Sequence, residues 1–171
     1  MRTLSDVIEE RIYSAVRYLL AKKIKPTIEV DHITDLDKDA LDKIRYELGV
    51  EGFILDVDDT LRQDMRNIPI VNKKWLEMLK ERFKVIVVSN GMDKRLDDYF
   101  SGVGIGYIQF AHKPLKKNFE KACKELEISP EKVLVVGDSL FDDIYGGKRM
   151  NMKTALVKKC IKTKPEEDFE K

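Results

Sequence analysis

The sequence has few cysteines, no long apolar run and almost no net charge. Its two cysteines, Cys123 and Cys160, form no CxxC pair, so the sequence favours neither a zinc site nor a disulfide framework. No stretch approaches the ~20 apolar residues that a membrane-spanning helix needs. Charged residues at positions 9–11 interrupt the N-terminal apolar pattern, so we expect no signal peptide and a cytoplasmic protein.

The charge balance limits the classes of partner. Lys and Arg number 32 and Asp and Glu number 31 among the 171 residues. This balance creates no whole-molecule field that would attract nucleic acid or an anionic membrane. The length predicts one domain with an additional segment. We divide the chain into an N-terminal helical extension (1–50), a core (51–160) and a charged tail (161–171).

The first apolar pattern of the chain is helical. Apolar residues over positions 4–21 recur near a 3.6-residue spacing, which predicts an amphipathic helix that ends before Pro26. Such a helix can pack on its own domain, or it can form a homo-oligomer or contact a membrane surface. Glu9 and Glu10 dilute the basic face that a membrane helix carries, which favours packing. A second helix is predicted over 38–48, closed by Gly49.

From residue 52 the pattern changes to short apolar runs alternating with helical segments. The runs begin at "GFILDV" and continue as "KVIVV", "GYIQF", "KVLVV" and "KTALV", with helices predicted near 72–82, 93–100, 115–127 and 140–150. Continuous apolar strands between helices are typical of a parallel sheet covered on both faces. Ligands of such sheets bind beyond the carboxyl ends of the strands.

Two carboxylates follow the first of these strands. Asp56 and Asp58 are separated by one residue, so both can project into one crevice at the strand end. Neighbouring carboxylates repel each other unless a cation lies between them, and Mg²⁺ favours oxygen ligands. The alternative is a solvated acidic turn.

A second acidic group follows the strand over 132–137. Asp138 stands at its end, and Asp142 and Asp143 lie one helical turn further on. Asp and Ser also favour helix N-termini, so capping is the alternative interpretation. Together with Asp56 and Asp58, however, these residues predict one acidic metal site.

Two further segments carry groups suited to phosphate. Ser89 ends the strand "KVIVV" and is followed by Asn90 and a glycine, so a hydroxyl and backbone N–H groups can cradle a phosphate oxygen. Lys113, just before a predicted helix, can balance the carboxylates and neutralise phosphate charge. The alternatives are a helix cap and an exposed loop lysine. His32 and His112 have no histidine partner at ligand spacing.

Four motifs in this order, "DVDDT", "VVSN", "HKP" and "VVGDSLFDD", resemble the haloacid dehalogenase (HAD) phosphohydrolase superfamily. The resemblance covers about residues 52–157. The segment from Lys113 to Val157 is similar to subfamily IIIA, which includes phosphatidylglycerophosphate phosphatases and bacterial relatives. The resemblance implies a Rossmann-like α/β fold with helices on both faces. Asp142, where relatives often have Thr, adds negative charge.

The resemblance also implies a mechanism. Asp56 would be the nucleophile that forms an aspartyl-phosphate, and Asp58 the acid and base. Lys113 would stabilise Asp56 and the phosphoryl charge. Thr60, Ser89 and Asn90 would bind phosphate, and Thr60 would also orient Asp58 or its loop. Mg²⁺ would be bound by Asp56, Asp138 and the backbone carbonyl of Asp58, with Asp143 in support.

The spacing between the motifs leaves no room for a cap domain. Residues 61–88 must hold a turn, a helix and a strand, and 91–112 a helix and a short strand. We therefore expect an open site for a large phosphorylated substrate, such as a lipid, a protein or a nucleic acid end, unless a neighbouring subunit closes it. The alternatives of another class are a phosphoacceptor signalling domain and a non-catalytic binding protein on the same scaffold.

Overall fold

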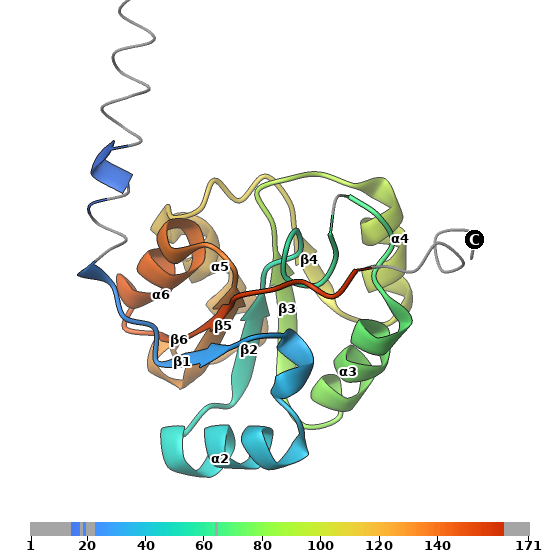
Figure 1. Cartoon of the computed structure of the whole chain (residues 1–171), viewed down its shortest axis with the longest axis horizontal. Helices are drawn as coiled ribbons and strands as arrows, with labels where there is room; N and C mark the ends of the chain where they lie inside the picture. The colour runs from blue at the N-terminus through green and yellow to red at the C-terminus, as the bar shows by residue number, and fades with distance from the viewer. Residues whose placement is uncertain (1–14, 18, 20–22, 64, 163–171) are drawn as a thin grey trace, which may run out of the picture.

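The computed structural model describes residues 15–17, 19, 23–63 and 65–162, which form strands and helices in alternation (Figure 1). The strands are β1 (Ile28–Val30), β2 (Gly52–Leu55), β3 (Lys84–Val88), β4 (Gly106–Ile108), β5 (Val133–Gly137) and β6 (Lys153–Val157). The α-helices are α2 (Lys38–Leu48), α3 (Ile70–Lys80), α4 (Lys94–Gly102), α5 (Lys116–Leu126) and α6 (Gly146–Lys148). Two 3₁₀ turns, η1 (Ile33–Asp35) and η2 (Pro130–Lys132), and a π-helical turn, η3 (Leu140–Tyr145), complete them.

The strands form one sheet in the order β1-β6-β5-β2-β3-β4, and every neighbouring pair is parallel. The predicted α/β fold is therefore confirmed, and the two weaker apolar runs are strands β4 and β6. β2 lies between β3 and β5, at the centre of the sheet. Because the strands are parallel, the loops that follow β2, β3 and β5 leave from the same edge.

The two faces of the sheet pack against different helices. Phe53 and Leu55 of β2 join the cluster that α2, α3 and α4 cover, while Ile54 points to the opposite face and joins the cluster around α5. This alternation follows from the two-residue repeat of a strand. Both faces of β2, the strand that leads to Asp56, are thus buried, so its end is held from both sides.

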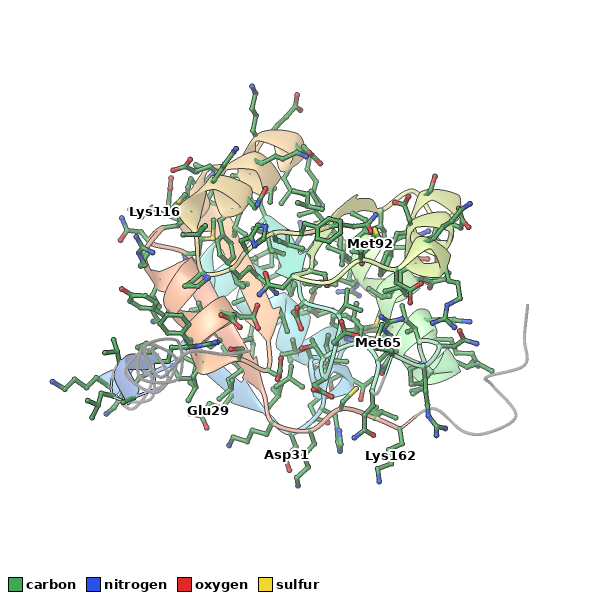
Figure 2. The ribbon with its side chains drawn as sticks, turned by 90° about the horizontal axis from the view of Figure 1, so that it is seen from above. Glu29, Asp31, Met65, Met92, Lys116 and Lys162 are labelled. Carbon is green, nitrogen blue, oxygen red and sulfur yellow. The ribbon has the colours of Figure 1, made fainter. Side chains whose placement is uncertain are left out.

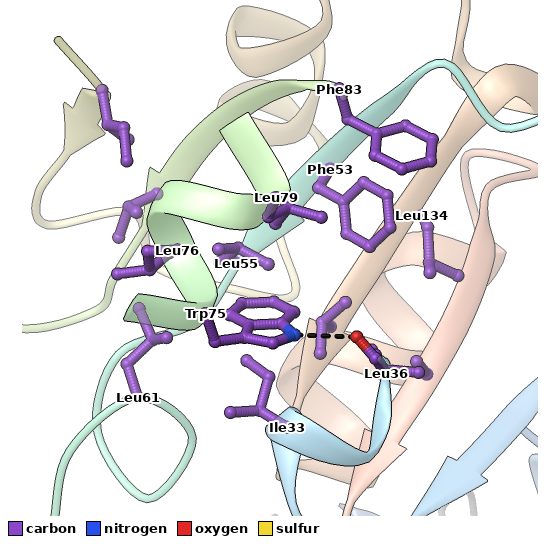
Figure 3. Close-up of a cluster of buried hydrophobic side chains, with 14 of the residues drawn as sticks. Ile33, Leu36, Phe53, Leu55, Leu61, Trp75, Leu76, Leu79, Phe83 and Leu134 are labelled. Carbon is purple, nitrogen blue, oxygen red and sulfur yellow. Dashed lines mark hydrogen bonds between the residues drawn. The ribbon is translucent and has the colours of Figure 1, made fainter. Parts of the chain in front are cut away.

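The segment before β2 belongs to the same packing. β1 pairs with β6, and Ile33 and Leu41 are buried in the cluster that contains Phe53. The indole Nε1 of Trp75 donates a hydrogen bond of 2.9 Å to the backbone oxygen of Leu36 (Figure 3). Residues 28–50, which we placed with an N-terminal extension, therefore contribute a strand and a helix to the core.

The predicted helix over 4–21 lies largely outside the described residues. Ala15–Arg17, Leu19 and Lys23 are helical. Arg17 forms an ion pair of 3.1 Å with Asp142, and its guanidinium carbon lies 4.7 Å from the centre of the Phe141 ring. The described part of this segment thus contacts the turn that follows β5. Among the described residues, no helix is long and apolar enough to cross a membrane.

Candidate active site

A cleft of about 280 Å³ opens at the carboxyl edge of the sheet. The loops after β2, β3 and β5 and the segment before α5 form its walls; Figure 2 looks onto this end of the molecule. Its lining residues are Asp56, Asp58, Asp59, Ser89, Asn90, Gly91, Lys113, Asp138, Ser139, Asp142 and Asp143. The structure brings together all the predicted site residues except Thr60, which is buried beneath Asp56.

Asp56 lies at the base of the cleft with both carboxylate oxygens engaged. Oδ1 accepts a hydrogen bond of 2.5 Å from Lys113 Nζ, and Oδ2 accepts one of 3.2 Å from Thr60 Oγ1. Thr60 has no exposed surface, and the hydrogen bond of its hydroxyl goes to Asp56. The roles that we predicted for Thr60 in phosphate binding and in orienting Asp58 stay predictions. Burial raises the pKa of Asp56 to about 7; the charge of Asp143 adds to the rise and Lys113 opposes it.

Lys113 bridges two buried carboxylates. Its Nζ also donates to Asp143 Oδ1 at 2.7 Å, and its backbone N–H donates to Asn90 Oδ1 at 2.6 Å. Burial alone would lower the pKa of Lys113, but Asp143 and Asp56 outweigh burial and raise it. The ammonium therefore stays charged and faces the candidate nucleophile. Asn90 holds the loop that carries Lys113 against the loop that follows β3.

Asp143 reaches this lysine through an unusual turn. The predicted helix over 140–150 is in fact the π-helical turn η3 followed by the short helix α6. Ile144 N–H donates to Ser139 O, the five-residue spacing of a π-turn. Asp143 Oδ2 accepts a hydrogen bond of 3.2 Å from the backbone N–H of Ser139, while Oδ1 accepts from Lys113.

Three carboxylates are placed to share a cation. One oxygen each of Asp56, Asp138 and Asp143 lies within 4.8 Å of the others. Although Asp138 keeps exposed surface, desolvation and the charge of Asp56 raise its pKa to about 6. Raised pKa values mean that Lys113 alone does not neutralise the cluster. An all-oxygen set with surplus negative charge fits a hard divalent cation such as Mg²⁺.

The Asp143 oxygens already accept hydrogen bonds from Lys113 and Ser139 N–H, which fits the supporting role predicted for it. The side chain of Asp58 lies outside this trio. The backbone carbonyl of Asp58, which we assigned to the metal, stays a prediction.

The loop after β3 presents Ser89 and backbone N–H groups. Ser89 is buried, and its Oγ accepts a hydrogen bond of 3.1 Å from Gly91 N–H. This bond curls the loop around the hydroxyl, which lines the cleft together with Asn90.

Sequence reasoning missed Arg62, which contacts Asp58, and Asp93, which contacts Arg62. The guanidinium of Arg62 donates to Asp58 Oδ1 at 2.8 Å and to Asp93 Oδ2 at 2.6 Å. A spacing of four residues marks a side-chain pair only within a helix, whereas the segment from Asp58 to Arg62 is a turn. Asp93 lies 31 residues from Arg62, so no local pattern links these two residues.

Two of the residues set aside earlier, Cys123 and His32, lie away from the chemistry, whereas the Cys160 thiol contacts the backbone oxygen of Thr60 at 3.6 Å. Cys123 is buried in the core cluster around α5. His32 contacts the backbone oxygen of Lys159 through Nδ1 at 2.9 Å. Neither residue lines the cleft of Asp56.

Comparison with known families and curated proteins gives consistent matches. The model of the haloacid dehalogenase-like hydrolases matches residues 66–151, a range that includes Ser89, Lys113 and Asp138 and begins after Asp56. The probable phosphatase YqeG of Bacillus subtilis is 37% identical over 113 residues, which are 65% of this chain and 66% of YqeG. The glyceraldehyde 3-phosphate phosphatase of Pyrococcus furiosus is 34% identical over 103 residues, 55% of this chain and 43% of that protein.

The chain thus spans 66% of the first of these relatives and 43% of the second. Among solved structures, an uncharacterized protein from Listeria monocytogenes serotype 4b superposes with a TM-score of 0.55 at 18% identity, covering 68% of this chain and 84% of that one. At this identity, the likeness concerns the fold alone.

Proposed function

Because this chain belongs to the haloacid dehalogenase-like hydrolases, we propose that it hydrolyses phosphomonoesters through a phosphorylated Asp56. The observation that carries the proposal is the setting of Asp56. Its carboxylate lies at the base of an open cleft, is oriented by Thr60 and faces the ammonium of Lys113. A nucleophile, a fixed positive charge and an anion-binding loop then line the same cleft.

The reaction takes place in two steps. An Asp56 oxygen attacks phosphorus while the bond from phosphorus to the ester oxygen breaks, and Asp58 gives its proton to the departing oxygen, which leaves as an alcohol. Asp58, now a carboxylate, takes a proton from water as that water attacks the aspartyl-phosphate. Inorganic phosphate leaves and both aspartates return to their initial states. Lys113 and the loop of Ser89 hold the phosphoryl oxygens throughout.

The cation belongs to the same proposal. Asp56, Asp138 and the backbone carbonyl of Asp58 would hold Mg²⁺, with Asp143 oriented behind them. When bound, Mg²⁺ supplies positive charge that offsets the carboxylates and the phosphoryl group. The separation of the three carboxylates supports this assignment.

The surroundings of the cleft favour a bulky or amphiphilic substrate. Four large apolar side chains with more than half of their surface exposed lie on loops at the strand ends: Met65 at 61%, Met92 at 62%, Phe110 at 54% and Leu115 at 57%. Figure 2 shows Met65 and Met92 on this side of the molecule. In the described chain, 61–88 holds α3 and β3 and 91–112 holds α4 and β4, with no additional domain. A phospholipid such as phosphatidylglycerophosphate, as in subfamily IIIA, fits this open apolar rim.

Phosphate release from a substrate panel tests the proposal. The panel includes phosphatidylglycerophosphate, glyceraldehyde 3-phosphate, nucleotides and phosphopeptides, each with Mg²⁺ and with EDTA. We expect Mg²⁺-dependent release that Asp56→Asn abolishes. Release by the Asp56→Asn protein at the wild-type rate would remove Asp56 as nucleophile. Efficient turnover of glyceraldehyde 3-phosphate alone would contradict the amphiphilic substrate but not the chemistry.

A further inference from the structure

The proposed mechanism assigns no role to Arg62, a buried cation that contacts Asp58. Its side chain is only 2% exposed, and its guanidinium contacts two carboxylates. Nε donates to Asp58 Oδ1 at 2.8 Å, and Nη1 donates to Asp93 Oδ2 at 2.6 Å. Burying a cation is costly unless its partners are well placed, so this geometry is strongly constrained.

The backbone returns Arg62 beneath Asp58. Asp59 adopts a left-handed conformation with φ of 59°, and its N–H donates to Arg62 O at 2.7 Å. Arg62 N–H in turn donates to Val57 O at 3.1 Å, and the backbones of Asp58 and Arg62 form an isolated bridge. The tight turn therefore fixes the backbone of Arg62 relative to Asp58.

Asp93 anchors the guanidinium of Arg62 through its second ion pair. Asp93 is the N-cap of α4 and accepts a hydrogen bond of 2.9 Å from Arg95 N–H. A residue anchored to the start of a helix moves little, so Arg62 is held between the loop after β2 and the loop after β3. The described residues give Asp58 no other side-chain hydrogen bond than the one from Arg62.

The two oxygens of Asp58 thus differ. Oδ1 is bound to Arg62, whereas Oδ2 faces the loop of Ser89: a Cβ added to Gly91 would lie 3.7 Å from Asp58 Oδ2 and 3.6 Å from Ser89 Oγ. We infer that Arg62 is a positioning residue that holds Asp58 by Oδ1, so that Oδ2 exchanges protons with the leaving oxygen and then with water. This inference rests on the proposed function, because it concerns the acid and base of that reaction.

Paired substrates that differ in leaving group test this role. p-Nitrophenyl phosphate loses a stable anion that needs no proton, whereas phenyl phosphate of nearly the same shape depends on the acid. The measured quantity is the ratio of kcat/KM for the two substrates, with Mg²⁺ present. This ratio does not depend on the fraction of folded protein.

In Arg62→Met we expect kcat/KM for phenyl phosphate to fall at least about tenfold more than for p-nitrophenyl phosphate, since general acids contribute about 10²–10⁴-fold. Arg62→Lys, which keeps the charge but lacks the planar guanidinium that can bind two carboxylates, should show an intermediate ratio. Asp58→Asn, which lacks the acid itself, sets the upper limit for the change in this ratio. Arg95→Met is the matched control, because Arg95 also contacts Asp93 but is 64% exposed and does not touch Asp58.

Each outcome decides a separate point. If wild-type protein releases phosphate from neither ester and from no substrate of the panel above, the proposed function fails. If wild type hydrolyses both and Arg62→Met lowers both equally, or leaves both unchanged, Arg62 has a structural role only and the inference is overturned. A ratio that also changes in Arg95→Met would assign the effect to Asp93 and not to the bond with Asp58.

Discussion

At the level of single residues, a missing Cβ decides where Asp143 lies. Gly137 ends β5, and a Cβ built on it would stand 2.2 Å from Asp143 Oδ2. The carboxylate occupies the space that any other side chain at position 137 would need. Asp143 can therefore reach Lys113 only because the strand ends in glycine.

Gly137→Ala should displace Asp143 and disturb the position of Lys113. Overpacking costs about 1–3 kcal/mol of unfolding free energy, and a shift of about 1 Å in a reacting group can lower kcat about a hundredfold. Urea denaturation and the rate of phosphate release measure the two effects. Gly102→Ala is the control, since a Cβ on Gly102 meets nothing within 4 Å. Equal behaviour of the two variants would mean that Asp143 adjusts freely.

The sequence predicted these strand-end residues better than their partners. Asp56 and Asp138 follow apolar runs, and parallel strands bring such ends to one edge whatever the loops do. The partner of Asp58 depends on a left-handed turn at Asp59, and the contact of Arg62 with Asp93 depends on where α4 begins. Neither is set by a repeating pattern, so pattern reasoning could not reach them.

At the level of elements, β1 and α2 are integral to the sheet and its core. β1 has three residues and pairs with β6, more than 120 positions along the chain. A strand this short has no readable alternation, which is why the apolar pattern did not predict a strand there. Leu41 of α2 is fully buried in the cluster with Phe53. The segment over 28–50 should therefore unfold together with the remainder of the sheet.

Leu41→Ala tests this expectation. If α2 packs as a core element, the substitution removes buried methyl groups and should lower the unfolding free energy by about 2–5 kcal/mol in one cooperative transition. Tyr46→Ala in the same helix is the control, because Tyr46 is 80% exposed and should change stability little. A small loss in Leu41→Ala, or a separate early transition, would indicate that this segment is an appendage.

At the level of the whole molecule, the overall charge and the local charge differ. The chain carries a net charge of +1, yet six aspartates line the cleft, three of them close enough to share a cation, and Lys113 is the one lysine among the lining residues. Distant surface charges are screened within about 10 Å at 0.1 M salt, so they cannot relieve this imbalance. The stability of the protein should therefore depend on how the cleft is neutralised, by protons or by a cation.

The pH dependence of stability follows from this competition. The pKa values of Asp56 and Asp138 rise from 3.8 to about 7 and about 6, so the folded state binds protons more tightly than the unfolded chain. Without metal, their contribution to stability is present below about pH 4 and is lost as pH rises through 6 and 7. If Mg²⁺ binds these carboxylates as we propose, it takes the place of those protons and, at a hundred times its Kd, adds about 2.7 kcal/mol to the free energy of unfolding. The rise in Tm on adding Mg²⁺ should thus be larger at pH 8 than at pH 5, and Asp138→Asn should reduce that difference. An equal rise at both pH values would mean that Mg²⁺ does not bind at these carboxylates.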